Sequence, residues 1–63
     1  MATTIFVVDD QESILTSVRS VLLDERYRVL TFVSAEALQD GLRIEKPDLI
    51  LIDIWLQIGR AHV

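Results

Sequence analysis

Two short apolar runs, each followed directly by aspartate, constrain the fold of this chain most strongly. Residues 5–8 have the sequence IFVV and precede Asp9 and Asp10. Residues 49–52 have the sequence LILI and precede Asp53. Uninterrupted apolar runs of this kind are typical of strands buried on both faces of a parallel sheet. The sequence therefore predicts a parallel sheet with acidic side chains at the ends of two strands.

The segment between the two runs predicts a helix, a strand and a second helix. Between residues 11 and 26, apolar side chains recur at helical spacing: Ile14, Leu15, Val18, Val21 and Leu22. Residues 28–32 are rich in β-branched and aromatic residues and predict a strand. Ser34 is placed to cap a helix over residues 35–45, and Pro47 separates that helix from the last strand. For Gly41 we favour close packing against the sheet; a merely tolerated glycine is the alternative.

The predicted order is β-α-β-α-β, with right-handed crossovers and parallel strands. This is an α/β fold, half of a doubly wound parallel sheet. The high hydrophobic fraction of 51% supports a globular chain with a buried core. A chain of 63 residues makes one small domain at most, and we expect its stability to be marginal.

Composition disfavours several classes of function. The net charge of -4 argues against direct nucleic-acid binding and against anionic membrane surfaces. The absence of cysteine excludes disulfides, thiolate metal sites and thiol nucleophiles. No stretch approaches the roughly 20 apolar residues that span a bilayer, so we expect a cytoplasmic location.

The acidic residues at the strand ends predict a cation site. If the strands at residues 5–8 and 49–52 are neighbours, the carboxylates of Asp9, Asp10 and Asp53 converge where doubly wound sheets bind ligands. Mg²⁺ would offset their repulsion. Simpler interpretations are a helix N-cap for Asp10 and a polar strand end for Asp53. Dinucleotide binding is disfavoured, because the turn after the first strand is acidic and contains no glycine.

Two motifs resemble bacterial response-regulator receiver domains, which have a flavodoxin-like fold. Residues 5–12, IFVVDDQE, resemble the opening of these domains, and residues 47–56, PDLILIDIWL, resemble their phosphorylation strand. With the intervening segment, the resemblance covers residues 4–56. Residues 53–57 look particularly like receivers of the NtrX type, which belong to transcriptional activators of nitrogen regulation.

The resemblance implies a non-enzymatic signalling module in which a sensor histidine kinase phosphorylates Asp53. It also implies that Mg²⁺ binds Asp10, Asp53 and the backbone carbonyl of Trp55, while Asp9 helps through water. The Trp55 side chain is expected to be an apolar lid with no catalytic role. Gln11 stands where the family often has an acid, with little expected consequence.

The resemblance ends after residue 56, before the family's later Ser or Thr and its phosphate-pairing lysine. We expect residues 1–56 to be the N-terminal half of a receiver and 57–63 to be a tail of other origin, in which His62 has no role. The alternative function is therefore a fragment unable to transfer phosphate that self-associates through its exposed sheet edge or apolar face. We expect such a fragment to form a homodimer.

Overall fold

The computed structural model describes residues 2–52, which form three strands and two helices. In chain order these are β1 (Thr4–Val8), α1 (Glu12–Asp24), β2 (Arg28–Phe32), α2 (Ala35–Ile44) and β3 (Leu49–Ile52). The predicted β-α-β-α-β order is confirmed. Both helices end one or two residues earlier than the outer limits expected from the sequence.

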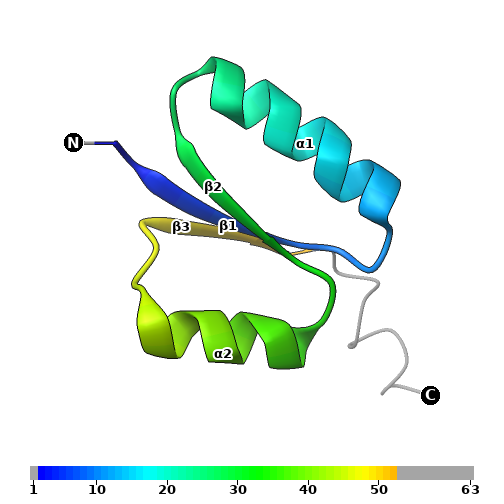
Figure 1. The fold of residues 1–63 in the computed structure, drawn as a ribbon, viewed down its shortest axis with the longest axis vertical. Helices are drawn as coiled ribbons and strands as arrows, with labels where there is room; N and C mark the ends of the chain where they lie inside the picture. The colour runs from blue at the N-terminus through cyan, green and yellow to red at the C-terminus, as the bar shows by residue number, and fades with distance from the viewer. Residues whose placement is uncertain (1, 53–63) are drawn as a thin grey trace.

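The sheet has the strand order β2-β1-β3, and both pairings are parallel. The two helices lie on opposite faces of this sheet, as Figure 1 shows. This arrangement is that of a doubly wound α/β sheet, and it confirms the predicted fold class. It also confirms that β1 and β3 are neighbours, which the predicted acidic site requires.

Strand β1 forms the centre of the core, because its alternating side chains supply both faces of the sheet. Phe6 and Val8 pack with Leu38 of α2 on one face. Ile5 and Val7 pack on the other face, in a cluster with a leucine of α1, Leu15. Every residue of β1 is buried. The prediction that residues 5–8 are covered on both faces is confirmed.

Helix α2 follows the sequence signals closely. The Ser34 hydroxyl accepts a hydrogen bond from the Ala37 backbone N–H at 3.1 Å, so the predicted cap is present. Gly41 lies against the ring of Phe32, where a Cβ atom on residue 41 would come within 2.5 and 2.7 Å of ring carbons. The close-packing interpretation of this glycine is therefore confirmed.

The start of helix α1 does not match the simpler interpretation of Asp10, in which this residue is the helix N-cap. The residue in the N-cap position is Gln11, and its side chain makes no capping hydrogen bond. The N-cap interpretation of Asp10 is therefore wrong. After the helix, Arg26 adopts a positive φ of 68°, which turns the chain back toward β2. No helix within residues 2–52 has the length and apolarity needed to cross a membrane.

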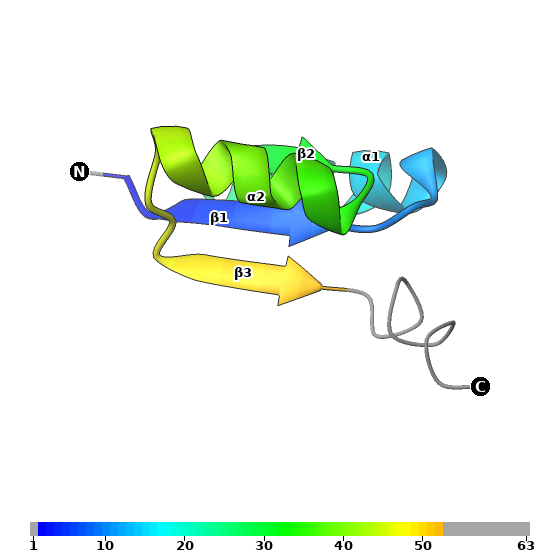
Figure 2. The ribbon, with the colours of Figure 1, turned by 90° about the horizontal axis from the view of Figure 1, so that it is seen from below.

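Strand β3 differs from its prediction in burial. Leu49, Leu51 and Ile52 are 50%, 39% and 51% exposed, although the apolar run predicts a strand covered on both faces. The reason is that, within residues 2–52, β3 pairs only with β1 and no close backbone contact joins it to either helix. Of its residues, Ile50 packs against the core cluster of Phe6, Val8 and Leu38. Figure 2 shows β3 beside β1, with the two strands running in the same direction and both helices on the other side of β1 in this view.

Candidate functional site

Asp9 fixes the acidic turn after β1 through two hydrogen bonds, one to the sheet and one within the turn. Its backbone N–H donates to the carbonyl of Phe32, the last residue of β2, at 3.1 Å. Its side-chain Oδ1 accepts a hydrogen bond from the Gln11 backbone N–H at 2.9 Å. The residue is only 8% exposed. Asp9 is therefore a fixed part of the loop that leads from β1 into α1.

The two acids of the turn differ in exposure. Within the described part of the chain, no buried side-chain oxygen or nitrogen lacks a hydrogen-bond partner. Asp10, the next residue, is exposed. The turn thus presents one fixed and one solvent-facing carboxylate.

The register of β1 and β3 sets the level at which the two strands end. Val8 pairs with Ile52, so the last residues of both strands lie opposite each other. Neighbouring strands are about 4.8 Å apart. Asp9 follows Val8 and Asp53 follows Ile52 in the sequence. The predicted site residues Asp53 and Trp55 themselves lie outside the described residues, as do residues 57–63.

The described residues hold only part of a cation-binding set. No group of three or more His, Cys, Asp or Glu side chains that could hold a metal ion occurs within residues 2–52. Asp9 and Asp10 are the two predicted ligating or supporting acids that fall in this range. Both lie at the carboxyl end of β1, where ligands bind in doubly wound sheets.

A hollow of about 200 Å³ lies beside the acidic turn. Asp9 is its only charged lining residue among those described, and the others are apolar: Val7, Val8, Ile14, Val18, Leu51 and Ile52. These residues come from β1, α1 and β3. Asp9 therefore borders a mostly apolar hollow beside the acidic turn.

Sequence reasoning missed the partners that fix Asp9. The hydrogen bond to the Gln11 N–H spans two residues, and this short-range pattern is one that aspartate forms often. It could have been anticipated from the sequence. The hydrogen bond from Asp9 to the Phe32 carbonyl depends on the pairing of β1 with β2, and no local sequence signal indicates it.

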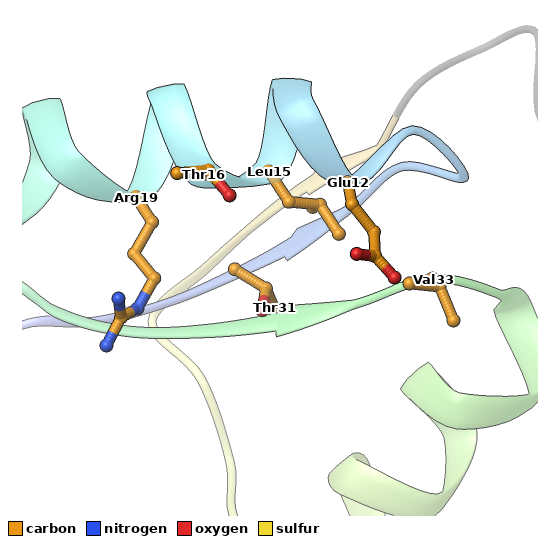
Figure 3. Close-up of a pocket in the computed structure, with 6 residues that line it drawn as sticks. All are labelled: Glu12, Leu15, Thr16, Arg19, Thr31 and Val33. Atoms are coloured by element: carbon orange, nitrogen blue, oxygen red, sulfur yellow. The ribbon is translucent and has the colours of Figure 1, made fainter.

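A larger hollow lies between α1 and β2 and does not include Asp9 or Asp10. Its volume is about 430 Å³, and its lining residues are Glu12, Leu15, Thr16, Arg19, Thr31 and Val33. In Figure 3, Glu12 and Arg19 lie at opposite ends of it, and both side chains extend from α1 toward β2. This hollow offers no convergent set of charged ligands and is separate from the acidic turn.

Comparison with known proteins gives a consistent result. The family described as "Response regulator receiver domain" matches residues 5–59. The chain is 38% identical over 60 residues to the nitrogen assimilation regulatory protein NtrX of Azorhizobium caulinodans, a match that covers 95% of this chain and 13% of that protein. No solved structure gives a significant match.

A second relative is the alkaline phosphatase synthesis transcriptional regulatory protein PhoP of Bacillus subtilis. It is 42% identical over 52 residues, which is 82% of this chain and 22% of that protein. The chain thus spans less than a quarter of the length of either relative. The family match extends over most of the chain, and the parallel sheet and the acidic turn agree with it. The chain belongs to the response-regulator receiver domain family.

Proposed function

We propose that this chain acts as a phospho-acceptor module in two-component signal transduction, with Asp53 as the acceptor. A carboxylate oxygen of Asp53 attacks the phosphorus of a phosphohistidine on a sensor histidine kinase. The phosphorus–nitrogen bond breaks, the histidine nitrogen takes up a proton, and an acyl phosphate forms on Asp53. The observation that carries this proposal is the acidic turn at the end of β1, beside a β3 strand that ends at the same level.

The proposal includes a Mg²⁺ ion bound by Asp10, Asp53 and the backbone carbonyl of Trp55. The donor set fits this ion, because Mg²⁺ prefers hard oxygen ligands and retains several waters. Asp9 acts through one of those waters, using the oxygen that does not bind the Gln11 N–H. When bound, the cation offsets the negative charge of the incoming phosphoryl group.

The names of the two relatives support a broader proposal about the parent protein. Both are named as regulatory proteins, and the PhoP name specifies transcriptional regulation. We propose that the parent protein of this chain also regulates transcription, in the cytoplasm, through a region outside these 63 residues. The receiver itself acts as a signalling module, not as an enzyme, and binds neither nucleic acid nor membrane.

Phosphorylation by an acyl phosphate donor tests the proposal directly. The chain is incubated with the donor, with and without Mg²⁺, and the adduct is located by mass spectrometry of the intact chain and its peptides. We expect one Mg²⁺-dependent phosphoryl group on the wild type and none on Asp53→Asn. The matched control is Asp40→Asn, which removes an exposed carboxylate from α2. An unmodified wild type, or an adduct retained in Asp53→Asn, would contradict the proposal.

The exposure of β3 favours a second candidate function, self-association into a homodimer. Within residues 2–52 its outer edge pairs with no strand, and with Leu49, Leu51 and Ile52 exposed it is a template for another strand. In this alternative the chain is a fragment unable to transfer phosphate, with residues 1–56 as the receiver part and 57–63 as a tail of other origin. Two copies meet through β3 or the apolar faces beside it.

Analytical ultracentrifugation over a wide concentration range tests this alternative. A dimer that dissociates in Leu51→Lys supports association through β3, because a charge on an edge strand blocks pairing. The matched control is Leu42→Lys, which adds the same charge at a similarly exposed leucine of α2, 41% against 39% exposed. A monomer at all concentrations rules out the homodimer and leaves the phospho-acceptor proposal unaffected.

A further inference from the structure

A reciprocal pair of hydrogen bonds joins Asp48 to Thr4 at the start of the β1–β3 pairing. The backbone N–H of Asp48 donates to the carbonyl oxygen of Thr4 at 2.8 Å. In return, the backbone N–H of Thr4 donates to the side-chain Oδ2 of Asp48, also at 2.8 Å. The two residues are 44 positions apart in the chain. This pair is a tertiary contact that closes directly before β3 begins at Leu49.

The sequence of β3 contains little information that could fix its register. All four of its residues are leucine or isoleucine. A slip of one residue turns each side chain to the opposite face of the sheet. In an alternating strand such a slip exposes apolar groups and buries polar ones, but in LILI it exchanges one branched aliphatic side chain for another. The hydrophobic pattern therefore discriminates weakly between registers.

The Asp48 side chain supplies the discrimination that β3 lacks. Its hydrogen bond with Thr4 requires the carboxylate of residue 48 to lie opposite the first residue of β1. A strand slipped by one residue would place the side chain of Leu49 or Pro47 there, and neither side chain contains a hydrogen-bond acceptor. A hydrogen bond to a charged group is stronger than one between neutral groups. Among registers one residue apart, only the observed one therefore offers the Thr4 N–H a side-chain acceptor.

From this arrangement we infer that Asp48 is a positioning residue, which fixes β3 against β1 and so sets where the chain enters the acidic site. With the observed register, Val8 and Ile52 lie opposite each other at the carboxyl ends of the two strands. A slip of one residue moves the end of β3 by about 3.3 Å along the strand. The consequence for Mg²⁺ binding rests on the proposed function, whereas the consequence for the register does not.

Two substitutions at residue 48 separate the effect of the hydrogen bond to Thr4 from the effect of the negative charge. Asp48→Ala removes the acceptor, whereas Asp48→Asn keeps a side-chain oxygen that accepts from the Thr4 N–H. Both remove one negative charge. Asp40→Ala serves as a matched control, because Asp40 is an exposed aspartate on α2 for which no hydrogen bond or ion pair is found within residues 2–52.

The first measurement is the strand pairing, which is monitored through nuclear magnetic resonance contacts between β1 and β3. In Asp48→Ala we expect the Val8–Ile52 contact to be lost or divided among registers, while the Val8–Phe32 contact between β1 and β2 remains. We also expect the Thr4 amide to exchange about tenfold faster, which is the effect of losing one charge-assisted hydrogen bond. Asp48→Asn and Asp40→Ala should both retain the wild-type contacts.

The second measurement is a Mg²⁺ titration followed at the backbone amides of Asp9 and Asp10. We expect Asp48→Ala to bind Mg²⁺ about tenfold more weakly, as is typical when a supporting residue of a metal site is removed. Asp48→Asn should restore wild-type affinity. If the wild type shows no response to Mg²⁺, the proposed metal site is wrong, but the pairing measurement still decides the role of Asp48.

An unchanged Val8–Ile52 contact in Asp48→Ala would overturn the inference. If that variant does not fold, the same contacts are measured in Thr4→Pro, which removes the donor and keeps the carboxylate. Proline is tolerated at the first residue of a strand. Loss of the Val8–Ile52 contact in this variant supports the inference, and its retention overturns it.

Discussion

Strands β1 and β3 have similar apolar sequences and lie side by side, yet their surroundings differ. In β1, Phe6 and Val8 are 0% and 1% exposed, whereas in β3 Leu51 and Ile52 are 39% and 51% exposed. The difference lies in their neighbours. β1 has a strand on either side and a helix on each face. Within residues 2–52, β3 has β1 as its one neighbouring strand, and Ile50 is its one residue that packs against a core cluster.

This comparison teaches that an apolar run encodes the tendency to be buried, not the burial itself. Full burial of a large apolar side chain contributes about 1.5–3 kcal/mol, and this gain requires other parts of the chain to cover it. β1 obtains its cover from residues 12–44, which include both helices and β2. The stability of the described fold therefore depends mainly on β1, and three substitutions test that conclusion.

The largest expected effect is that of Phe6→Ala. Phe6 is fully buried, and its ring lies 4.9 Å from the ring of Phe32, centroid to centroid. We expect the free energy of unfolding to fall by about 3–5 kcal/mol, measured by urea denaturation followed by circular dichroism. Leu51→Ala is the comparison in β3 and should cost much less. Equal losses at the two positions would show that the two strands are equally covered.

An intermediate effect is expected for Gly41→Ala, which probes how closely α2 covers the sheet. Alanine favours a helix over glycine by about 1 kcal/mol. Here, however, the new Cβ would meet the Phe32 ring, which also lies 4.9 Å from the Phe6 ring, centroid to centroid. Such overpacking costs about 1–3 kcal/mol, so we expect a net destabilisation of about 1 kcal/mol in thermal or urea unfolding.

The control for this substitution is Gln39→Ala, at an exposed position of the same helix. It should leave the free energy of unfolding unchanged or slightly raise it, because alanine has the higher helix propensity. If Gly41→Ala raised the stability as well, the close approach of α2 to Phe32 would not be a constraint on the fold.

The smallest effect is expected for Leu49→Thr in β3. Leu49 is 50% exposed, and threonine is well suited to a strand. We expect the free energy of unfolding to change by no more than about 0.5 kcal/mol, independently of protein concentration. A loss of about 2 kcal/mol that grows with concentration would break the comparison, because it would show that a second copy covers β3.

The sequence allowed much of the local structure to be predicted. The strand at residues 28–32, the cap formed by Ser34 and the close packing of Gly41 were all anticipated and are all present. The strand and the cap depend on interactions over a few residues, so a single segment indicates them. Gly41 could be interpreted because a glycine inside a helix usually has a specific reason, such as close packing.

Of the predictions that concern the acidic site, only the arrangement of its strands is confirmed. The topology of parallel crossovers makes β1 and β3 neighbours. It also places Asp9 and Asp10, at the carboxyl end of β1, beside the carboxyl end of β3. The N-cap interpretation of Asp10 was wrong, because the helix begins one residue later and Asp9 makes the local hydrogen bond. The roles of Asp53 and Trp55 stay predictions.

The sequence by itself determined the elements of this protein, because hydrophobic periodicity, proline and capping residues act over short distances. It also determined the acidic character of the turn after β1. Only the tertiary structure decided that β1 is fully buried whereas most of β3 is exposed. It also decided that Asp48 forms a pair of hydrogen bonds with Thr4. Burial and long-range hydrogen bonds depend on which segments meet, and no local pattern contains that information.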